Sequence, residues 1–205
     1  MAESAGGWNR REFVNAAALL ALALGVPAAA VRLTDLADDD VPDAGQRALL
    51  REVSQLVIPR TDTPGAGDAG TGDFVALALT HGLEGSRRPV PAAFARWQRA
   101  DGSLRYPAWL AAELDRRVGG SFVAAPEGPR RAALRALDSE AFADGVEFHP
   151  WRTIKALVLT GYYTSEAGGS RELRYEPVPG RWQPDLPQTA ATRAISNDWT
   201  AVDFG

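Results

Sequence analysis

Apolar residues recur three to four positions apart along the middle of the chain, and this spacing is typical of α-helices. In residues 44–58, for example, Leu49, Val53 and Leu56 fall on one side, with polar side chains opposite. Pro59 has no amide hydrogen to donate within a helix, so this helix is expected to stop before it. The same pattern predicts further helices over residues 74–82, 91–100, 107–118, 130–137, 139–143 and 151–160. No segment shows the alternation of a strand, and the chain is predicted to be all-α.

Polar residues, Pro and Gly mark the expected ends of these helices. Asp43 follows Val-Pro and is expected to cap the first helix, and Asp73 or Thr71 is expected to cap the second. Pro107 suits the first turn of a helix. The sequence Pro-Glu-Gly-Pro at 126–129 is expected to break the chain between two helices.

The helical periodicity ends near residue 160. Residues 161–205 are rich in Gly, Pro and aromatic side chains and predict a long irregular tail. A tail of this length without helices or strands is expected to lie on another surface. Tyr and Trp bury a large area with few rotatable bonds, so the tail suits contact with a partner protein. It suits the covering of the domain's own helices equally well.

The N-terminal segment has the pattern of a twin-arginine export signal. Arg10 and Arg11 form the arginine pair, and Phe13 is the bulky apolar residue two positions later. Proteins that use this route cross the membrane already folded. We therefore expect the twin-arginine translocase as a partner and the periplasm as the destination.

A short Ala-rich apolar segment follows the arginine pair, and Ala28 and Ala30 supply the small residues of a cleavage site. The segment is shorter than the ~20 apolar residues that span a bilayer, so no stable transmembrane span is expected. The sequence thus predicts a signal peptide at 1–30 and one domain at 31–205. The alternative is an amphipathic first helix of the mature fold.

Composition narrows the chemistry that this chain can carry. A length of 205 residues with 45% hydrophobic side chains suits one domain with its own core. The net charge of -4, with no basic stripe, argues against nucleic acid as a partner. The chain has no Cys, which excludes disulfides, thiolate-bound clusters and c-type haem attachment. It has only two His residues, so an all-protein zinc or copper site would need carboxylates for most of its ligands, which argues against a metal. No cofactor is expected in this chain.

Two sequence features offer candidate chemistry. Gly65, Gly67 and Gly70 have the spacing Gly-x-Gly-x-x-Gly of a nucleotide-binding turn, but no strand precedes them, which favours a shaped structural loop. His81 and Glu84 are expected to share a helix end, where they could form an acid-base pair or complement the helix dipole. His149 suits a packed or capping residue. A hydrolase that uses these side chains is an alternative function.

Three blocks of sequence resemble the gluconate 2-dehydrogenase subunit 3 family. They are Ile-Pro-x-Thr-Asp-Thr-Pro-Gly-Ala at 58–66, Leu-x-Leu-Thr-Gly-Tyr-Tyr-Thr-Ser-Glu at 157–166 and Tyr-x-Pro-Val-Pro-Gly at 175–180. The resemblance implies a non-catalytic small subunit that binds, matures and exports a FAD-dependent dehydrogenase of the glucose-methanol-choline type. It places FAD and the oxidation of a sugar or sugar acid in the large subunit, with a cytochrome c subunit as a further partner.

The resemblance also favours a partner interface on these blocks, formed by Pro59, Thr61, Asp62, Thr63, Pro64, Gly65, Tyr162, Tyr163, Ser165, Glu166, Arg174, Tyr175, Pro179, Gly180 and Trp182. Relatives often carry a Cys near the last Pro-Gly segment, and this chain has none, so its attachment to a partner is expected to be non-covalent. A stand-alone carbohydrate-binding or scaffold module that uses the Trp residues is a second alternative.

Overall fold

The structure is a computed structural model, and it describes residues 42–175, 187, 189, 192 and 195–196. Helices dominate these residues, which confirms the predicted all-α class. The α-helices are α2 (Ala44–Val57), α3 (Thr71–His81), α4 (Tyr106–Val118), α5 (Glu127–Ala141) and α6 (Pro150–Tyr163). None of the helices within this part of the chain is long and apolar enough to cross a membrane.

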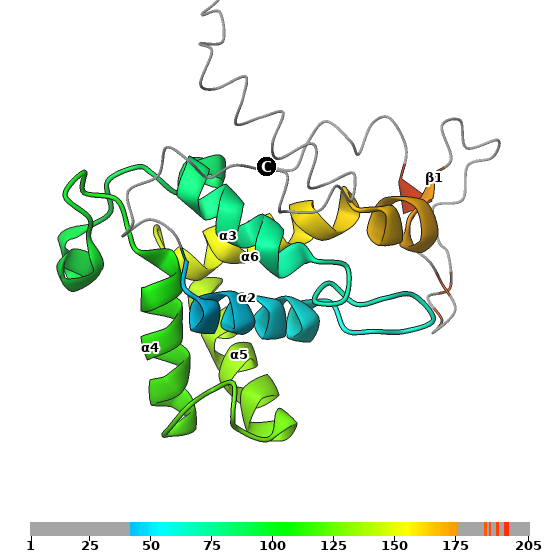
Figure 1. Cartoon of the computed structure of the whole chain (residues 1–205), viewed down its shortest axis with the longest axis horizontal. Helices are drawn as coiled ribbons and strands as arrows, with labels where there is room; N and C mark the ends of the chain where they lie inside the picture. Colours follow the sequence, from blue (N-terminus) through cyan, green and yellow to red (C-terminus); the bar gives the residue numbers. More distant parts are fainter. Residues whose placement is uncertain (1–41, 176–186, 188, 190–191, 193–194, 197–205) are drawn as a thin grey trace, which may run out of the picture.

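Short elements complete the described part of the chain. Two 3₁₀ turns lie between α3 and α4, η3 (Leu83–Gly85) and η4 (Ala92–Trp97), and a π-helical segment, η5 (Ala167–Glu172), follows α6. The two-residue strands β1 (Arg174–Tyr175) and β2 (Ile195–Ser196) pair in parallel. β1 lies beside η5, close to the end of α6 (Figure 1).

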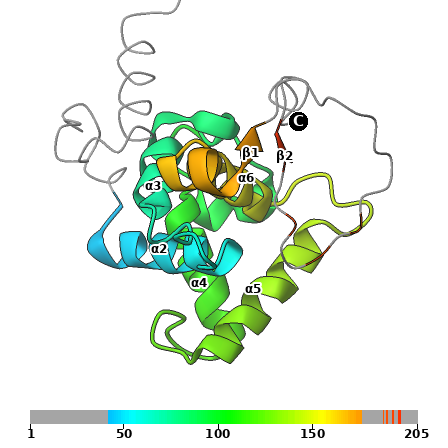
Figure 2. The same ribbon diagram turned by 90° about the vertical axis from the view of Figure 1, so that its right-hand side faces the viewer.

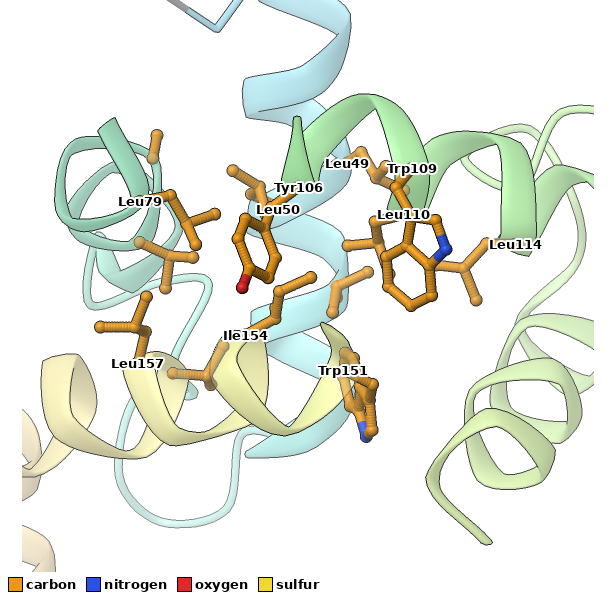
Figure 3. Close-up of a cluster of buried hydrophobic side chains, with 14 of the residues drawn as sticks. Leu49, Leu50, Leu79, Tyr106, Trp109, Leu110, Leu114, Trp151, Ile154 and Leu157 are labelled. Atoms are coloured by element: carbon orange, nitrogen blue, oxygen red, sulfur yellow. The ribbon is translucent and has the colours of Figure 1, made fainter. Parts of the chain in front are cut away.

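The helix α3 packs against both α2 and α6, and these three helices form the centre of the domain (Figures 1 and 2). The helices α4 and α5 pack against each other and extend to one side. Figure 3 shows the core where α2, α3, α4 and α6 meet, and its labelled side chains are Leu49, Leu50, Leu79, Tyr106, Trp109, Leu110, Leu114, Trp151, Ile154 and Leu157. All of them are buried.

Local signals located several helix ends correctly. The Asp43 carboxylate accepts from the Gln46 amide at 2.8 Å, and the Gln46 side chain accepts from the Asp43 amide at 3.2 Å, a complete capping box. This capping box satisfies two of the backbone amides at the start of α2 that have no partner within the helix. Pro107 lies in the first turn of α4 as expected.

The predicted cap of α3 was wrong. Gly70 is the N-cap, with a left-handed φ of 79° and no side chain to offer, and Thr71 is the first helical residue. The Thr71 amide instead donates to the Ala66 carbonyl at 3.0 Å. The loop backbone therefore does what a side-chain cap was expected to do.

The predicted break at 126–129 was also wrong. Pro126 is the N-cap of α5, and residues 127–129 lie in its first turn. The helix runs without interruption to Ala141, so the short helices predicted at 130–137 and 139–143 are one. Pro129 falls in the first turn, where an amide hydrogen has no partner in the helix. Residues 91–100, predicted as a helix, form only the 3₁₀ turn η4, and Gln98 is already extended.

The start of the predicted tail was placed too early. Helix α6 continues through Gly161 to Tyr163, and η5 adds further helical turns before residue 173. Gly161 is buried against the Phe74 ring of α3, so packing keeps the helix going past a residue with low helix propensity. The residues of the tail from 176 onward lie outside the described residues, apart from the few named above.

Candidate functional site

The loop at residues 58–70, between α2 and α3, is held by its own backbone. The Ala66 amide donates to the Ile58 carbonyl at 2.9 Å, which closes the loop. Within it, the Thr61 amide donates to the Thr63 carbonyl at 3.1 Å, and the two hydroxyls lie 3.2 Å apart. Pro, Asp and Thr favour turns of this kind, and these bonds hold the shaped structural loop that the sequence favoured here.

Helix α2 braces the loop from one side. The Gln55 amide nitrogen donates to the Asp68 carboxylate at 3.1 Å, and the Asp68 amide donates to the Gln55 side-chain oxygen at 3.2 Å. Arg60 adds an ion pair to Asp68 at 2.9 Å. Burial by itself would raise the pKa of Asp68, but the Arg60 guanidinium and the Gln55 amide lower it below its ordinary value.

Close packing on α2 explains two of the glycines in the Gly-x-Gly-x-x-Gly sequence. A Cβ at Gly65 would lie 2.5 Å from the side-chain nitrogen of Gln55 on α2 and 2.7 Å from the Arg60 amide nitrogen, and one at Gly67 would lie 2.7 Å from the Arg51 carbonyl oxygen. No side chain larger than hydrogen fits at such distances. The spacing therefore serves the contact between this loop and its neighbours, which agrees with the structural interpretation of the motif.

Helix α6 and η5 brace the loop from the other side. The Tyr162 hydroxyl donates to the Pro64 carbonyl at 3.0 Å, and the Thr63 hydroxyl donates to the Glu172 carboxylate at 2.5 Å. These bonds join residues that are about a hundred positions apart in sequence. They bring together two of the three blocks that resemble the family, 58–66 and 157–166, in one braced assembly.

The two tyrosines of the predicted interface differ in depth, and Tyr162 does not lie at the surface. Tyr162 is 1% exposed, and its ring meets that of Tyr163 edge to face at 5.3 Å. Tyr163 is only partly buried, and burial raises the pKa of its hydroxyl. Tyr162 therefore supports the loop from inside the domain, whereas Tyr163 reaches the surface.

The remaining predicted interface residues divide by exposure. Pro59, Thr61, Asp62 and Glu166 are exposed, and the Glu166 carboxylate pairs with Arg171 at 2.5 Å. Thr63 and Gly65 are buried, while Pro64 and Ser165 are partly buried. The Ser165 hydroxyl donates to the Tyr162 carbonyl at 2.6 Å and accepts from the Gly168 amide at 3.2 Å, so it joins α6 to η5.

Several predicted site residues lie outside the described residues. They are the export and cleavage residues Arg10, Arg11, Phe13, Ala28 and Ala30, and the tail residues Pro179, Gly180 and Trp182. Arg174 and Tyr175 form β1, in which only the backbone is described.

The two histidines occupy different environments. His81 ends α3, but Glu84 lies beyond Gly82 in η3 with a positive φ of 51°, so the expected shared helix end is not formed. His149 is the N-cap of α6, and its Nδ1 accepts from the Trp151 amide at 3.2 Å. Burial lowers the pKa of His149, which favours the neutral ring that this cap requires. The capping role expected for His149 is confirmed.

Within residues 42–175 and the few described residues of the tail, no group of three or more His, Cys, Asp or Glu side chains is arranged to hold a metal ion. The main candidate site is the loop at 58–70, which side-chain hydrogen bonds hold between α2 and α6. Fold and loop together define a small all-α domain with a rigid, shaped loop partly open to solvent.

Residues 44–180 match the family model of gluconate 2-dehydrogenase subunit 3, and the chain belongs to that family. Membership makes it a small accessory subunit of a dehydrogenase complex. The matched region contains all of the α-helices described above, the braced loop and η5. No curated protein and no solved structure matches the chain.

Proposed function

We propose that the chain is the non-catalytic small subunit that binds, matures and co-exports a FAD-dependent dehydrogenase of the glucose-methanol-choline type. FAD and the oxidation of a sugar or sugar acid belong to the large subunit in this proposal. Electrons leave through a cytochrome c subunit or another acceptor. The observation that carries the proposal is the family match over residues 44–180.

The braced loop supports this function because rigid loops bind partners with little loss of conformational entropy. Its exposed residues, Pro59, Thr61 and Asp62, lie in a loop that is bonded to α2 through Asp68 and to α6 and η5 through Pro64 and Thr63. We expect them to need little reordering on contact. Glu166 lies exposed just beyond α6. We assign the contact with the large subunit to these exposed residues and to Tyr163, with the buried Thr63, Gly65 and Tyr162 as their support.

The export role falls to the twin-arginine pattern of Arg10 and Arg11. Because twin-arginine export carries folded proteins, one signal on this chain can carry a bound large subunit that has taken up FAD in the cytoplasm. Both subunits then function in the periplasm. In this proposal the small subunit also takes part in maturation, because the large subunit takes up FAD in the cytoplasm before the two are exported together.

The experiment replaces both arginines with lysine (R10K/R11K) in cells that also express a large subunit without a signal of its own. Dehydrogenase activity is expected to stay in the cytoplasm, since lysine keeps the charge but not the pattern. R87K/R88K, an adjacent pair inside the described domain, is the matched control and should leave export unchanged. Normal periplasmic activity with R10K/R11K would contradict the proposal.

A further inference from the structure

A groove of about 200 Å³ lies where the end of α2 meets α5 and α6. Leu56, Val57 and Leu134 give it apolar walls, together with Trp151. Trp151 is 1% exposed, and Figure 3 shows its indole nitrogen at the end of the ring that lies away from the labelled leucines. The volume is below the roughly 300–1,000 Å³ of pockets that enclose small-molecule substrates. The groove suits a few side chains of another protein better than a sugar.

Basic side chains surround these apolar walls. Arg131, Arg135 and Lys155 line the groove, and Asp138 is its one lining carboxylate among the residues that the structure describes. Arg131 and Arg135 are exposed. Arg131 has an exposed partner in Glu127 at 2.6 Å, whereas Arg135 makes no ion pair within the described part of the chain. This local excess of positive charge contrasts with the net charge of -4 of the whole chain.

The one carboxylate is already engaged. Asp138 accepts from Lys155 Nζ at 2.7 and 3.0 Å and from the Trp151 indole at 2.7 Å. Burial alone would raise the pKa of Asp138, but the bonds from Lys155 and Trp151 lower it, so the group stays charged. Asp138 and Lys155 therefore largely neutralise each other. Arg135 remains available to an incoming anion, and Arg131 can exchange its exposed pair with Glu127 for such an anion, because exposed ion pairs contribute little free energy.

An exposed aromatic ring extends the groove. Phe142 is 52% exposed, and Lys155 Nζ lies 4.7 Å from the centre of its ring. The Arg152 guanidinium lies 5.2 Å from the same ring. Because Lys155 lines the groove and also covers Phe142, the ring and the groove form one continuous surface. Aromatic and Arg side chains together are enriched in the centres of protein interfaces.

We propose that this α5–α6 groove receives an acidic segment of the dehydrogenase large subunit, with an apolar side chain inserted between α2 and α5. The inference rests on the proposed function and adds a second contact surface to the braced loop. Carboxylates of the segment pair with Arg131 and Arg135, whose planar guanidinium groups bind carboxylates through two parallel hydrogen bonds. The apolar side chain contacts Leu134, and a neighbouring one covers Phe142.

The test measures binding of the full chain to the purified large subunit by calorimetry at 50 mM and 200 mM salt. R131E/R135E is expected to bind about tenfold to a hundredfold more weakly, because it places like charges against the segment. It should also lose most of the salt dependence seen with the wild-type chain. Phe142→Ala is expected to bind severalfold more weakly and to keep the wild-type salt dependence.

R88E/R96E is the matched control, since it makes the same change of charge at two exposed arginines away from the groove. It should bind as the wild type does. Melting curves of each free variant establish whether its fold is intact. If R131E/R135E does not fold, F142A still tests the groove.

The outcomes separate this inference from the proposed function. A wild-type chain that does not bind the large subunit refutes the proposed function itself. Binding by the wild type with no change in R131E/R135E or in F142A overturns the groove as a contact surface and leaves the proposed function standing. Two other results would overturn it as well. If R131E/R135E altered the self-association of the free chain, the groove would be assigned to a second copy. If it altered proteolysis only within residues 33–43, a segment with five Asp residues, the groove would be assigned to that segment of the same chain.

Discussion

Replacing Gly161 with alanine tests the contact between α3 and α6 on which the braced loop depends. Gly161 is buried in α6, and a Cβ there would lie 3.0 Å from Cγ of the Phe74 ring and closer still to Cδ1. Phe74 is 7% exposed, so its ring has little room to rotate away. The added methyl group must therefore push the two helices apart or force the ring out of its rotamer.

Two opposing effects set the change in the free energy of unfolding on Gly161→Ala. Overpacking a well-filled core by one methyl group costs about 1–3 kcal/mol. Alanine in a helix interior gains about 1 kcal/mol over glycine. Because the methyl group meets the ring close to its attachment, we expect the first effect to dominate and the free energy of unfolding to fall by about 1–2 kcal/mol. For a chain of this size this lowers Tm by roughly 2–8 °C.

Urea and thermal unfolding monitored by circular dichroism measure this change. Gly128→Ala is the matched control, because Gly128 also lies in a helix, α5, and a Cβ there would meet nothing within 4 Å. It should be neutral or stabilising by up to about 1 kcal/mol. The double variant F74L/G161A should be less destabilised than the sum of its parts, since the smaller side chain makes room. Equal stabilities of G161A and G128A would refute the reasoning.

Two further predictions concern the surroundings of the loop. Tyr162→Phe removes the hydroxyl that donates to Pro64 at 3.0 Å, and the free energy of unfolding should fall by about 1 kcal/mol, with faster amide exchange in residues 59–66. Unchanged exchange there would contradict the bracing role. His149→Asn keeps a side-chain acceptor for the Trp151 amide but does not titrate. Burial lowers the pKa of His149 in the folded state, so the unfolded chain takes up a proton more readily and wild-type stability should decline relative to the variant as pH falls from 7.5 to 5.5. Parallel stability curves over this range would show that the ring titrates alike in both states.

The tests at Gly161 and Tyr162 also bear on how the family blocks are interpreted. Gly161 and Tyr162 lie in the block at 157–166, yet the structure gives both of them a structural task inside the domain. Glu166, in the same block, is exposed and pairs with Arg171, and only the proposed function assigns it to contact with the large subunit. A sequence block that marks a family can thus combine buried packing residues with exposed ones.

The sequence by itself determined the helical class and most helix positions. Apolar spacing located α2, α4 and α6 because residues three and four apart share a helix face whatever surrounds them. The Asp43 cap of α2 and the His149 cap of α6 were predicted correctly for a similar reason, since a cap joins residues two or three positions apart. The order of the blocks was enough to identify the family.

Only the tertiary structure decided which features of the site are surface and which are support. Tyr162 has a polar tip and an apolar ring, so its sequence context allowed either place, and contact with Pro64 from a distant part of the chain settled it. The glycines at 65 and 67 acquired a reason only when α2 was placed against them. The pairing of Thr63 with Glu172 and the groove where α2 meets α5 and α6 likewise join segments far apart in sequence. Local preferences fix an element through near neighbours, whereas burial and long-range contact depend on how the finished helices pack.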